Sequence, residues 1–212
     1  MSTKAAISLL TLAALAAGIL LWRPTRPASY VNLPPRATGP WVALGDSLTA
    51  GYGATDGQDY PTLLAKRLGL AITNLGVHGH TSADGLARVD EVAQLQPRVV
   101  LLCLGGNDVL NQQPRAAMVA NLAAIIDRLH QAGSFVVLIG VRGPGLRDKN
   151  EAHFRTLARN KQVLYVPDIL RGVFLKPIYM ADAVHPNDEG YALIAGRLEQ
   201  VLKPWLPRLE AR

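Results

Sequence analysis

The chain has 212 residues, 49% of them hydrophobic, which suffices for one α/β domain with a substantial core but not for two sizeable domains. The formal net charge is +6, but four of the 22 Lys and Arg residues precede the first acidic residue, Asp46, and the rest nearly balance the 16 Asp and Glu. This distribution excludes a basic folded face, so we predict no nucleic-acid partner.

Residues 5–22 form an uncharged, mostly apolar run preceded by Lys4 and followed by Arg23, close to the minimum length of a membrane-spanning helix. We therefore predict an N-terminal hydrophobic helix in residues 1–22. It is either an uncleaved signal anchor or a cleaved signal peptide, because Ala14-Leu15-Ala16 resembles a small-x-small cleavage site. An anchor places the protein on the periplasmic side of the inner membrane, and cleavage leaves it periplasmic or secreted. A buried soluble helix is the remaining alternative.

Residues 23–40 contain five prolines, a composition that extends the backbone and breaks helices, and we predict a linker there. The predicted catalytic domain occupies residues 41–208. Within it, apolar or β-branched runs predict strands at Trp41–Leu44, Ala71–Leu75, Arg98–Leu104, Phe135–Val141 and Val163–Val166. Helical patterns cover Tyr60–Leu68, Ser82–Leu95, Pro114–Gln131, Asn150–Asn160 and Asp188–Leu202. Strict alternation of strands and helices predicts an α/β fold of three layers, with a parallel sheet between helices.

The third and fourth of these strands are nearly continuous apolar runs, as expected of central parallel strands that are buried on both faces. The only cysteine, Cys103, lies in the third run and is predicted to be a buried core residue. With one cysteine, no intrachain disulfide can form.

Ser47 directly follows the first predicted strand and Gly45-Asp46, so it lies at the carboxyl end of a strand, where open α/β sheets bind their ligands. Asp182 and His185 share one short loop near the end of the chain. A separation of three residues lets the carboxylate bond one ring nitrogen and leave the other free for a serine. Taken singly, a serine in a turn is most often a helix cap and a lone histidine a surface residue.

Two further loops follow strands at the same predicted sheet edge. In the loop Asn74 to Thr81, Gly76 and Gly79 allow a backbone N–H to come close to a substrate oxygen. In Gly105-Gly106-Asn107-Asp108, the Asn107 amide is placed to donate a hydrogen bond into the same site, although a helix cap is an equal alternative. The convergence of four segments on one edge favours a catalytic site.

These four segments resemble, in order, the conserved blocks of the GDSL or SGNH hydrolases, and most of all the small bacterial lysophospholipase, thioesterase and arylesterase group. The resemblance covers Trp41 to about Leu206. It implies a flavodoxin-like five-stranded parallel sheet and an enzyme without a metal or organic cofactor. It also implies that Ser47 is the nucleophile, His185 the base and Asp182 its partner.

By the same resemblance, the oxyanion hole consists of Ser47 N–H, Gly79 N–H and the Asn107 amide, with Gly76 as an alternative glycine. The chain departs from the family in one block, because His78 and His80 flank the glycine where relatives usually carry a small polar and an acidic residue. This departure bears on substrate choice more than on catalysis.

The predicted activity is therefore that of a serine esterase acting on small acyl esters or lipids through an acyl-enzyme. Lysophospholipids and short-chain or aryl esters are favoured over thioesters, because export separates the enzyme from cytosolic acyl-CoA. Alternatives are removal of O-acetyl groups from cell-envelope glycans and a non-catalytic, membrane-tethered binding module. A nucleotide-binding module is disfavoured, because residues 45–51 fit no phosphate-binding pattern. No protein partner is inferred.

Overall fold

The computed structural model describes residues 29–141 and 149–211. The predicted N-terminal helix in residues 1–22 and the start of the predicted linker lie outside these ranges. Within the described ranges, no helix is both long enough and apolar enough to cross a membrane.

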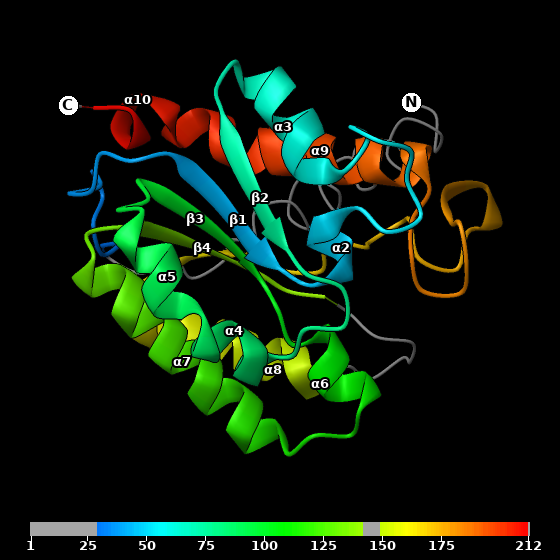
Figure 1. The fold of residues 1–212 in the computed structure, drawn as a ribbon, viewed down its shortest axis with the longest axis horizontal. Helices are drawn as coiled ribbons and strands as arrows, with labels where there is room; N and C mark the ends of the chain where they lie inside the picture. Colours follow the sequence, from blue (N-terminus) through cyan, green and yellow to red (C-terminus); the bar gives the residue numbers. More distant parts are fainter. Residues whose placement is uncertain (1–28, 142–148, 212) are drawn as a thin grey trace, which may run out of the picture.

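The domain is built on one sheet of five parallel strands, which confirms the predicted fold class (Figure 1). In chain order the strands are Trp41–Gly45 (β1), Ile72–Gly76 (β2), Val99–Cys103 (β3), Phe135–Ile139 (β4) and Leu164–Val166 (β5). Their order in the sheet is β2-β1-β3-β4-β5, with Trp41 opposite both Ile72 and Val99. The chain therefore reverses direction across the sheet between β1 and β3, and the loops after these strands meet at that point.

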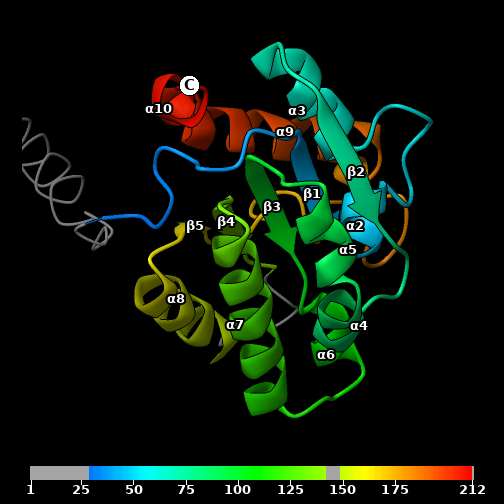
Figure 2. The ribbon, with the colours of Figure 1, turned by 60° about the vertical axis from the view of Figure 1, so that its left-hand side comes forward.

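Helices cover both faces of the sheet (Figure 2). One face carries α3 (Tyr60–Leu68), α9 (Asp188–Leu202) and α10 (Leu206–Leu209). The other carries α4 (Ser82–Ala87), α5 (Val89–Gln94), α7 (Arg115–Gln131) and α8 (Lys149–Lys161). Short helices also lie in the connections: α2 (Ser47–Ala50), α6 (Gly106–Leu110), η1 (Pro177–Tyr179) and η2 (Lys203–Trp205).

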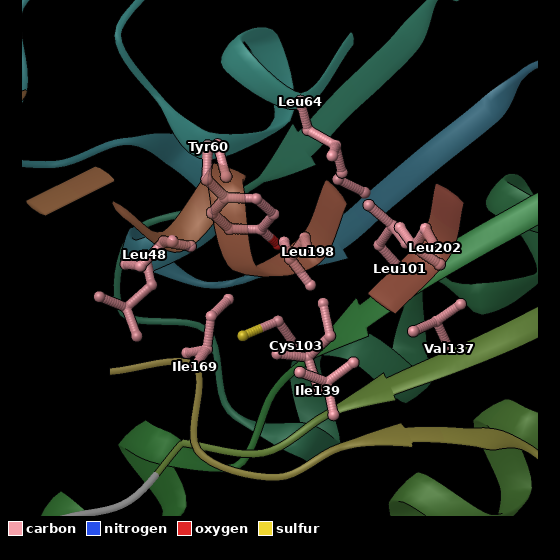
Figure 3. Close-up of a cluster of buried hydrophobic side chains, with 14 of the residues drawn as sticks. Leu48, Tyr60, Leu64, Leu101, Cys103, Val137, Ile139, Ile169, Leu198 and Leu202 are labelled. Atoms are coloured by element: carbon pink, nitrogen blue, oxygen red, sulfur yellow. The ribbon is translucent and has the colours of Figure 1, made fainter. Parts of the chain in front are cut away.

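The two cores follow from the alternation of side chains along each strand. In β3, Leu101 and Cys103 point to the face covered by α3 and α9, whereas Val100 and Leu102 point to the face covered by α7. Figure 3 shows the first core, in which Cys103 lies among leucines and isoleucines. The thiol is completely buried, as predicted, and burial raises its pKa.

Each predicted strand is present, and so are the predicted helices other than the second, with ends shifted by no more than two residues. The predicted helix Ser82–Leu95 is instead two helices, α4 and α5, separated at Arg88. Gly85 lowers helical propensity within this segment and lies against Leu104, where a Cβ would come 2.3 Å from Cδ1 of that leucine. The Arg88 guanidinium donates to the carbonyl of Leu75 at the end of β2 (3.3 Å).

The described part of the predicted linker, residues 29–40, packs against the domain. Asn32 donates to the carbonyls of His130 and Ser134 (2.9 and 3.0 Å), and the Tyr30 ring meets that of Trp205 edge to face at 5.3 Å. These contacts extend the packed structure to the N-terminal side of the predicted domain limit at residue 41.

Candidate active site

The Ser47 hydroxyl lies at the carboxyl end of β1, because the chain turns from strand to helix within two residues. Asp46 caps α2 by accepting a hydrogen bond from Leu48 N–H (3.0 Å). A Cβ at Gly45 would lie 2.0 Å from Oγ1 of Thr49, so only glycine allows the helix to fold back this closely on the strand. The turn presents the Ser47 side chain at the edge of the sheet and leaves its own N–H, at the first helical position, without an acceptor inside the helix.

Asp182 organises the loop that carries His185. One oxygen of its carboxylate accepts hydrogen bonds from the backbone N–H groups of Val184 and His185 (2.8 and 2.7 Å). The other oxygen lies 2.7 Å from Nδ1 of the His185 ring. Asp182 therefore holds both the backbone and the ring of the histidine, as the three-residue spacing predicts.

Partial burial by itself would raise the pKa of Asp182. Hydrogen bonds from Val184 N–H and from the ring and N–H of His185 lower it by a larger amount, so the pKa falls from 3.8 to about 2. The carboxylate is thus ionised at neutral pH and can only accept hydrogen bonds. It follows that Nδ1 of His185 carries a proton and that Nε2 is the basic nitrogen of the neutral ring.

Nε2 of His185 lies 3.0 Å from Oγ of Ser47, across 138 positions of sequence. Both side chains are nearly buried, whereas the Asp182 side chain is 44% exposed. A hydroxyl bonded to an imidazole, itself bonded to a carboxylate, can lose its proton to the ring while the carboxylate stabilises the imidazolium.

The segment after α2 forms a strap over the histidine loop. The Tyr191 hydroxyl of α9 donates to the carbonyl of Tyr52 (2.9 Å), and the Tyr52 ring packs 4.5 Å from the ring of His185. Asp188, at the start of α9, accepts hydrogen bonds from the N–H and hydroxyl of Thr55, both at 2.8 Å. No sequence pattern predicted a role for these residues, and the only signal for Tyr52 is that it ends the segment Gly45–Tyr52 that contains Ser47.

The loop from Val77 to His80 lies beside the serine and histidine. Its start is fixed by a hydrogen bond from Val77 N–H to the carbonyl of Gly45 (3.1 Å). Gly79 is exposed and has a φ of +78°, a conformation that favours glycine. The centre of the His78 ring lies 4.7 Å from that of Tyr52, with the two rings tilted by 31°, and 6.0 Å from that of His185. Of the two histidines that depart from the family pattern, His78 therefore borders the site.

Gly76 differs from Gly79 in that its N–H is already hydrogen-bonded and its backbone is packed against α2. Its N–H donates to the side-chain oxygen of Asn74 (2.9 Å), whose amide in turn donates to the carbonyl of Thr49 (2.8 Å). A Cβ at Gly76 would lie 2.2 Å from the backbone nitrogen of Ala50. Gly76 thus allows β2 to touch α2, and its occupied N–H makes it a poor oxyanion donor compared with Gly79.

Asn107 lies in α6, just after β3, and its side-chain amide donates to the carbonyl of His80 (2.9 Å). One amide hydrogen is therefore used to hold the loop that contains Gly79, and the second remains to bind another acceptor. The structure thus brings the predicted residues Ser47, Gly79 and Asn107 to loops that follow β1, β2 and β3 at one sheet edge.

Asp46, beside the serine, is a second unusual carboxyl group. It is 2% exposed, and burial raises its pKa from 3.8 to about 6, although the hydrogen bond from Leu48 opposes this shift. Its charge state consequently changes near pH 6. In the described parts of the chain, no group of three His, Cys, Asp or Glu side chains is arranged to hold a metal ion.

Comparisons with known proteins show what the chain is similar to. A model described as the GDSL-like Lipase/Acylhydrolase family matches residues 43–193. An arylesterase of Vibrio mimicus is 32% identical over 173 residues, or 76% of this chain and 86% of the relative. The Escherichia coli K12 protein named thioesterase 1/protease 1/lysophospholipase L1 is 34% identical over 172 residues, or 77% and 83%. The crystal structure of TesA matches with a TM-score of 0.74 and 30% identity, over 78% of this chain and 99% of that one.

Proposed function

Since the chain belongs to the GDSL-like lipase/acylhydrolase family and is a carboxylic ester hydrolase, we propose that Ser47, His185 and Asp182 are its catalytic triad. The observation that carries this assignment is the continuous hydrogen-bonded chain from Oγ of Ser47 through the His185 ring to Asp182, with distances of 3.0 and 2.7 Å. An ionised carboxylate at its end fixes the tautomer that catalysis requires.

In the proposed reaction, Nε2 of His185 takes the Ser47 proton as Oγ attacks the ester carbonyl carbon. The N–H groups of Ser47 and Gly79 and the free amide hydrogen of Asn107 stabilise the resulting oxyanion. The intermediate collapses when His185 returns the proton to the leaving alcohol oxygen, and the ester bond breaks. Water then repeats the attack on the acyl-enzyme, again with His185 as base, and releases the acid.

Labelling with a fluorophosphonate tests the nucleophile, because only an activated serine reacts. We expect one adduct, on Ser47, in the native protein and none after heat denaturation. Ser47→Ala should abolish turnover of p-nitrophenyl acetate and butyrate. Asn107→Ala should lower turnover about 100- to 1000-fold, as loss of one oxyanion donor does elsewhere, whereas Asn111→Ala at the exposed end of the same helix should not. Wild-type rates in both Ser47→Ala and Asn107→Ala would falsify the proposal.

For the substrate, we propose lysophospholipids and short-chain or aryl acyl esters, with thioesters as a lesser class. The names of the relatives support this range of substrates, because they include arylesterase and lysophospholipase. A series of p-nitrophenyl esters of increasing acyl length separates the options. A maximum at long chains indicates lipid substrates, and activity confined to acetyl esters indicates O-acetyl groups of cell-envelope glycans instead.

We also propose that the protein is exported, held by an uncleaved N-terminal anchor or released by cleavage. The support is the uncharged run of residues 5–22 with Lys4 and Arg23 on its flanks. Mass spectrometry of the fluorophosphonate-labelled native protein reports the mature N-terminus directly. Recovery of the labelled protein only from the cytosol, with Met1 intact, would contradict export.

A further inference from the structure

Asp108 is a buried carboxylate next to Asn107 that the proposed reaction does not use. It is 3% exposed, and its two oxygens accept hydrogen bonds from the N–H and hydroxyl of Ser82, at 2.8 and 2.5 Å. Ser82 is the first residue of α4 and is completely buried. Asn121 of α7 donates to the same hydroxyl (3.1 Å). Both donors of Ser82 are therefore satisfied by one side chain of α6.

Asn107 and Asp108 together hold the end of the loop that carries Gly79. Asn107 binds the carbonyl of His80, and Asp108 binds Ser82, two residues further on. The start of the loop is bound to Gly45, at the end of the strand that precedes Ser47. The backbone from Val77 to Ser82 is thus fixed at both ends by the segments that present the other two proposed oxyanion donors.

From these contacts we infer that Asp108 is a positioning residue, which sets the Gly79 N–H at the correct distance from the Asn107 amide by anchoring Ser82. The inference rests on the proposed function of these donors. Both oxygens of the Asp108 carboxylate accept hydrogen bonds from Ser82, so Asp108 affects the reaction only by holding the loop that contains Gly79. Oxyanion stabilisation requires donors placed to within tenths of an ångström, and a displacement of about 1 Å can cost on the order of 100-fold in rate.

A carboxylate is the side chain that this contact requires. Ser82 presents two donors, N–H and O–H, and an ionised carboxylate presents acceptors only. An asparagine at position 108 has the same shape, but its NH2 group would face one of the Ser82 donors. If the NH2 group faces the Ser82 N–H, two donors oppose each other; if it faces Oγ, it can donate to the hydroxyl, but the O–H then loses its carboxylate acceptor. Because Ser82 is buried, water cannot replace the lost hydrogen bond, so the substitution weakens the anchoring of α4.

The test is the steady-state kinetics of Asp108→Asn on p-nitrophenyl butyrate, compared with Asp84→Asn. Asp84 lies at the same end of α4, is exposed, and accepts hydrogen bonds from the N–H and hydroxyl of Thr81 (2.8 and 2.7 Å). The two variants make the same chemical change at one helix terminus. Both should lower the melting temperature through the weakened helix end. Only Asp108→Asn should lower kcat, by about 10- to 100-fold with KM changed less than about threefold.

A double variant that combines Asp108→Asn with Asn107→Ala tests whether the two residues act on the same geometry. If both residues act on one geometry, the kcat loss of the double variant will be much smaller than the product of the single losses. The inference is overturned if folded Asp108→Asn keeps the wild-type kcat, or if its kcat falls no more than that of Asp84→Asn.

If Asn107→Ala itself keeps the wild-type rate, the proposed oxyanion hole fails instead, so the two failures are distinguishable. Should Asp108→Asn not fold, Ser82→Ala takes its place, since it removes only the hydroxyl donor. We then expect kcat to fall on the order of tenfold. An unchanged kcat in folded Ser82→Ala would overturn the inference.

Discussion

Gly53 lies directly against His185. A Cβ at Gly53 would come 3.3 Å from Cβ of the histidine and 2.7 Å from the carbonyl oxygen of Pro186, and the residue has a φ of +89°. The strap that follows the Ser47 helix thus supports the back of the histidine loop, and its closest approach requires the absence of a side chain.

Gly53→Ala should therefore push the histidine loop away from Ser47. We expect kcat to fall by about 10- to 100-fold, because Nε2 would leave hydrogen-bonding distance of Oγ. Gly57→Ala is the matched control, since Gly57 also has a positive φ (+76°) but nothing within 4 Å of its Cβ position. Kinetics of both variants with p-nitrophenyl butyrate check this, and equal losses in the two would contradict it.

Asp182→Asn should impair catalysis through the tautomer of His185. The amide would turn its oxygen to the backbone N–H groups of Val184 and His185 and its NH2 group to Nδ1, so that Nδ1 becomes the acceptor. Nε2 would then carry the proton and could not accept one from Ser47.

We expect kcat/KM of Asp182→Asn to fall by about 100- to 10,000-fold, with a comparable loss in the rate of fluorophosphonate labelling. Asp188→Asn serves as control, because it makes the same change in a carboxylate that binds Thr55 rather than the histidine ring. A loss in Asp182→Asn no larger than that in Asp188→Asn would refute the tautomer argument.

The raised pKa of Asp46 predicts a dependence of stability on pH. Because the folded-state pKa is about 6 and the ordinary value is 3.8, the folded protein binds more protons than the unfolded chain between these values. The contribution of Asp46 is thus fully present below about pH 4 and is lost as pH rises through about 6. A shift of about two pKa units corresponds to about 3 kcal/mol.

Asp46→Asn keeps an acceptor for Leu48 N–H and has no charge to bury. We therefore expect its melting temperature, relative to wild type, to increase between pH 4 and pH 7. Thermal unfolding between pH 4 and pH 7 measures the difference in melting temperature between Asp46→Asn and wild type. If this difference does not change with pH, Asp46 does not cause a dependence of stability on pH.

Gly76→Ala should destabilise the domain more than Gly79→Ala. The first places a methyl group 2.2 Å from the backbone of α2, whereas the second meets nothing within 4 Å and adds only the strain of a positive φ. We expect losses in unfolding free energy of roughly 3 kcal/mol and 1 kcal/mol, respectively. Urea unfolding of both variants tests this order, which would be reversed if Gly79 were the point of close packing.

Local sequence patterns sufficed to predict the strands and the long helices. The apolar runs around Leu101 and Val137 are long enough for strands buried on both faces, and the repeat from Met118 to Leu129 has helical spacing. The Asp182–His185 contact was also predictable, because three residues of one loop bring the two side chains together. The roles of the triad and of the oxyanion donors stay predictions until the variants are measured.

Contacts between distant segments were decided only by the tertiary structure. No local pattern indicates that Asp108 binds Ser82, that Gly53 touches His185, or that residues 29–40 lie against the domain. The periodicity of residues 82–95 favoured one helix, and packing of Gly85 against Leu104 accompanies its division into two. Hydrophobic periodicity is a property of neighbours along the chain, whereas these contacts depend on which loops the sheet order places side by side.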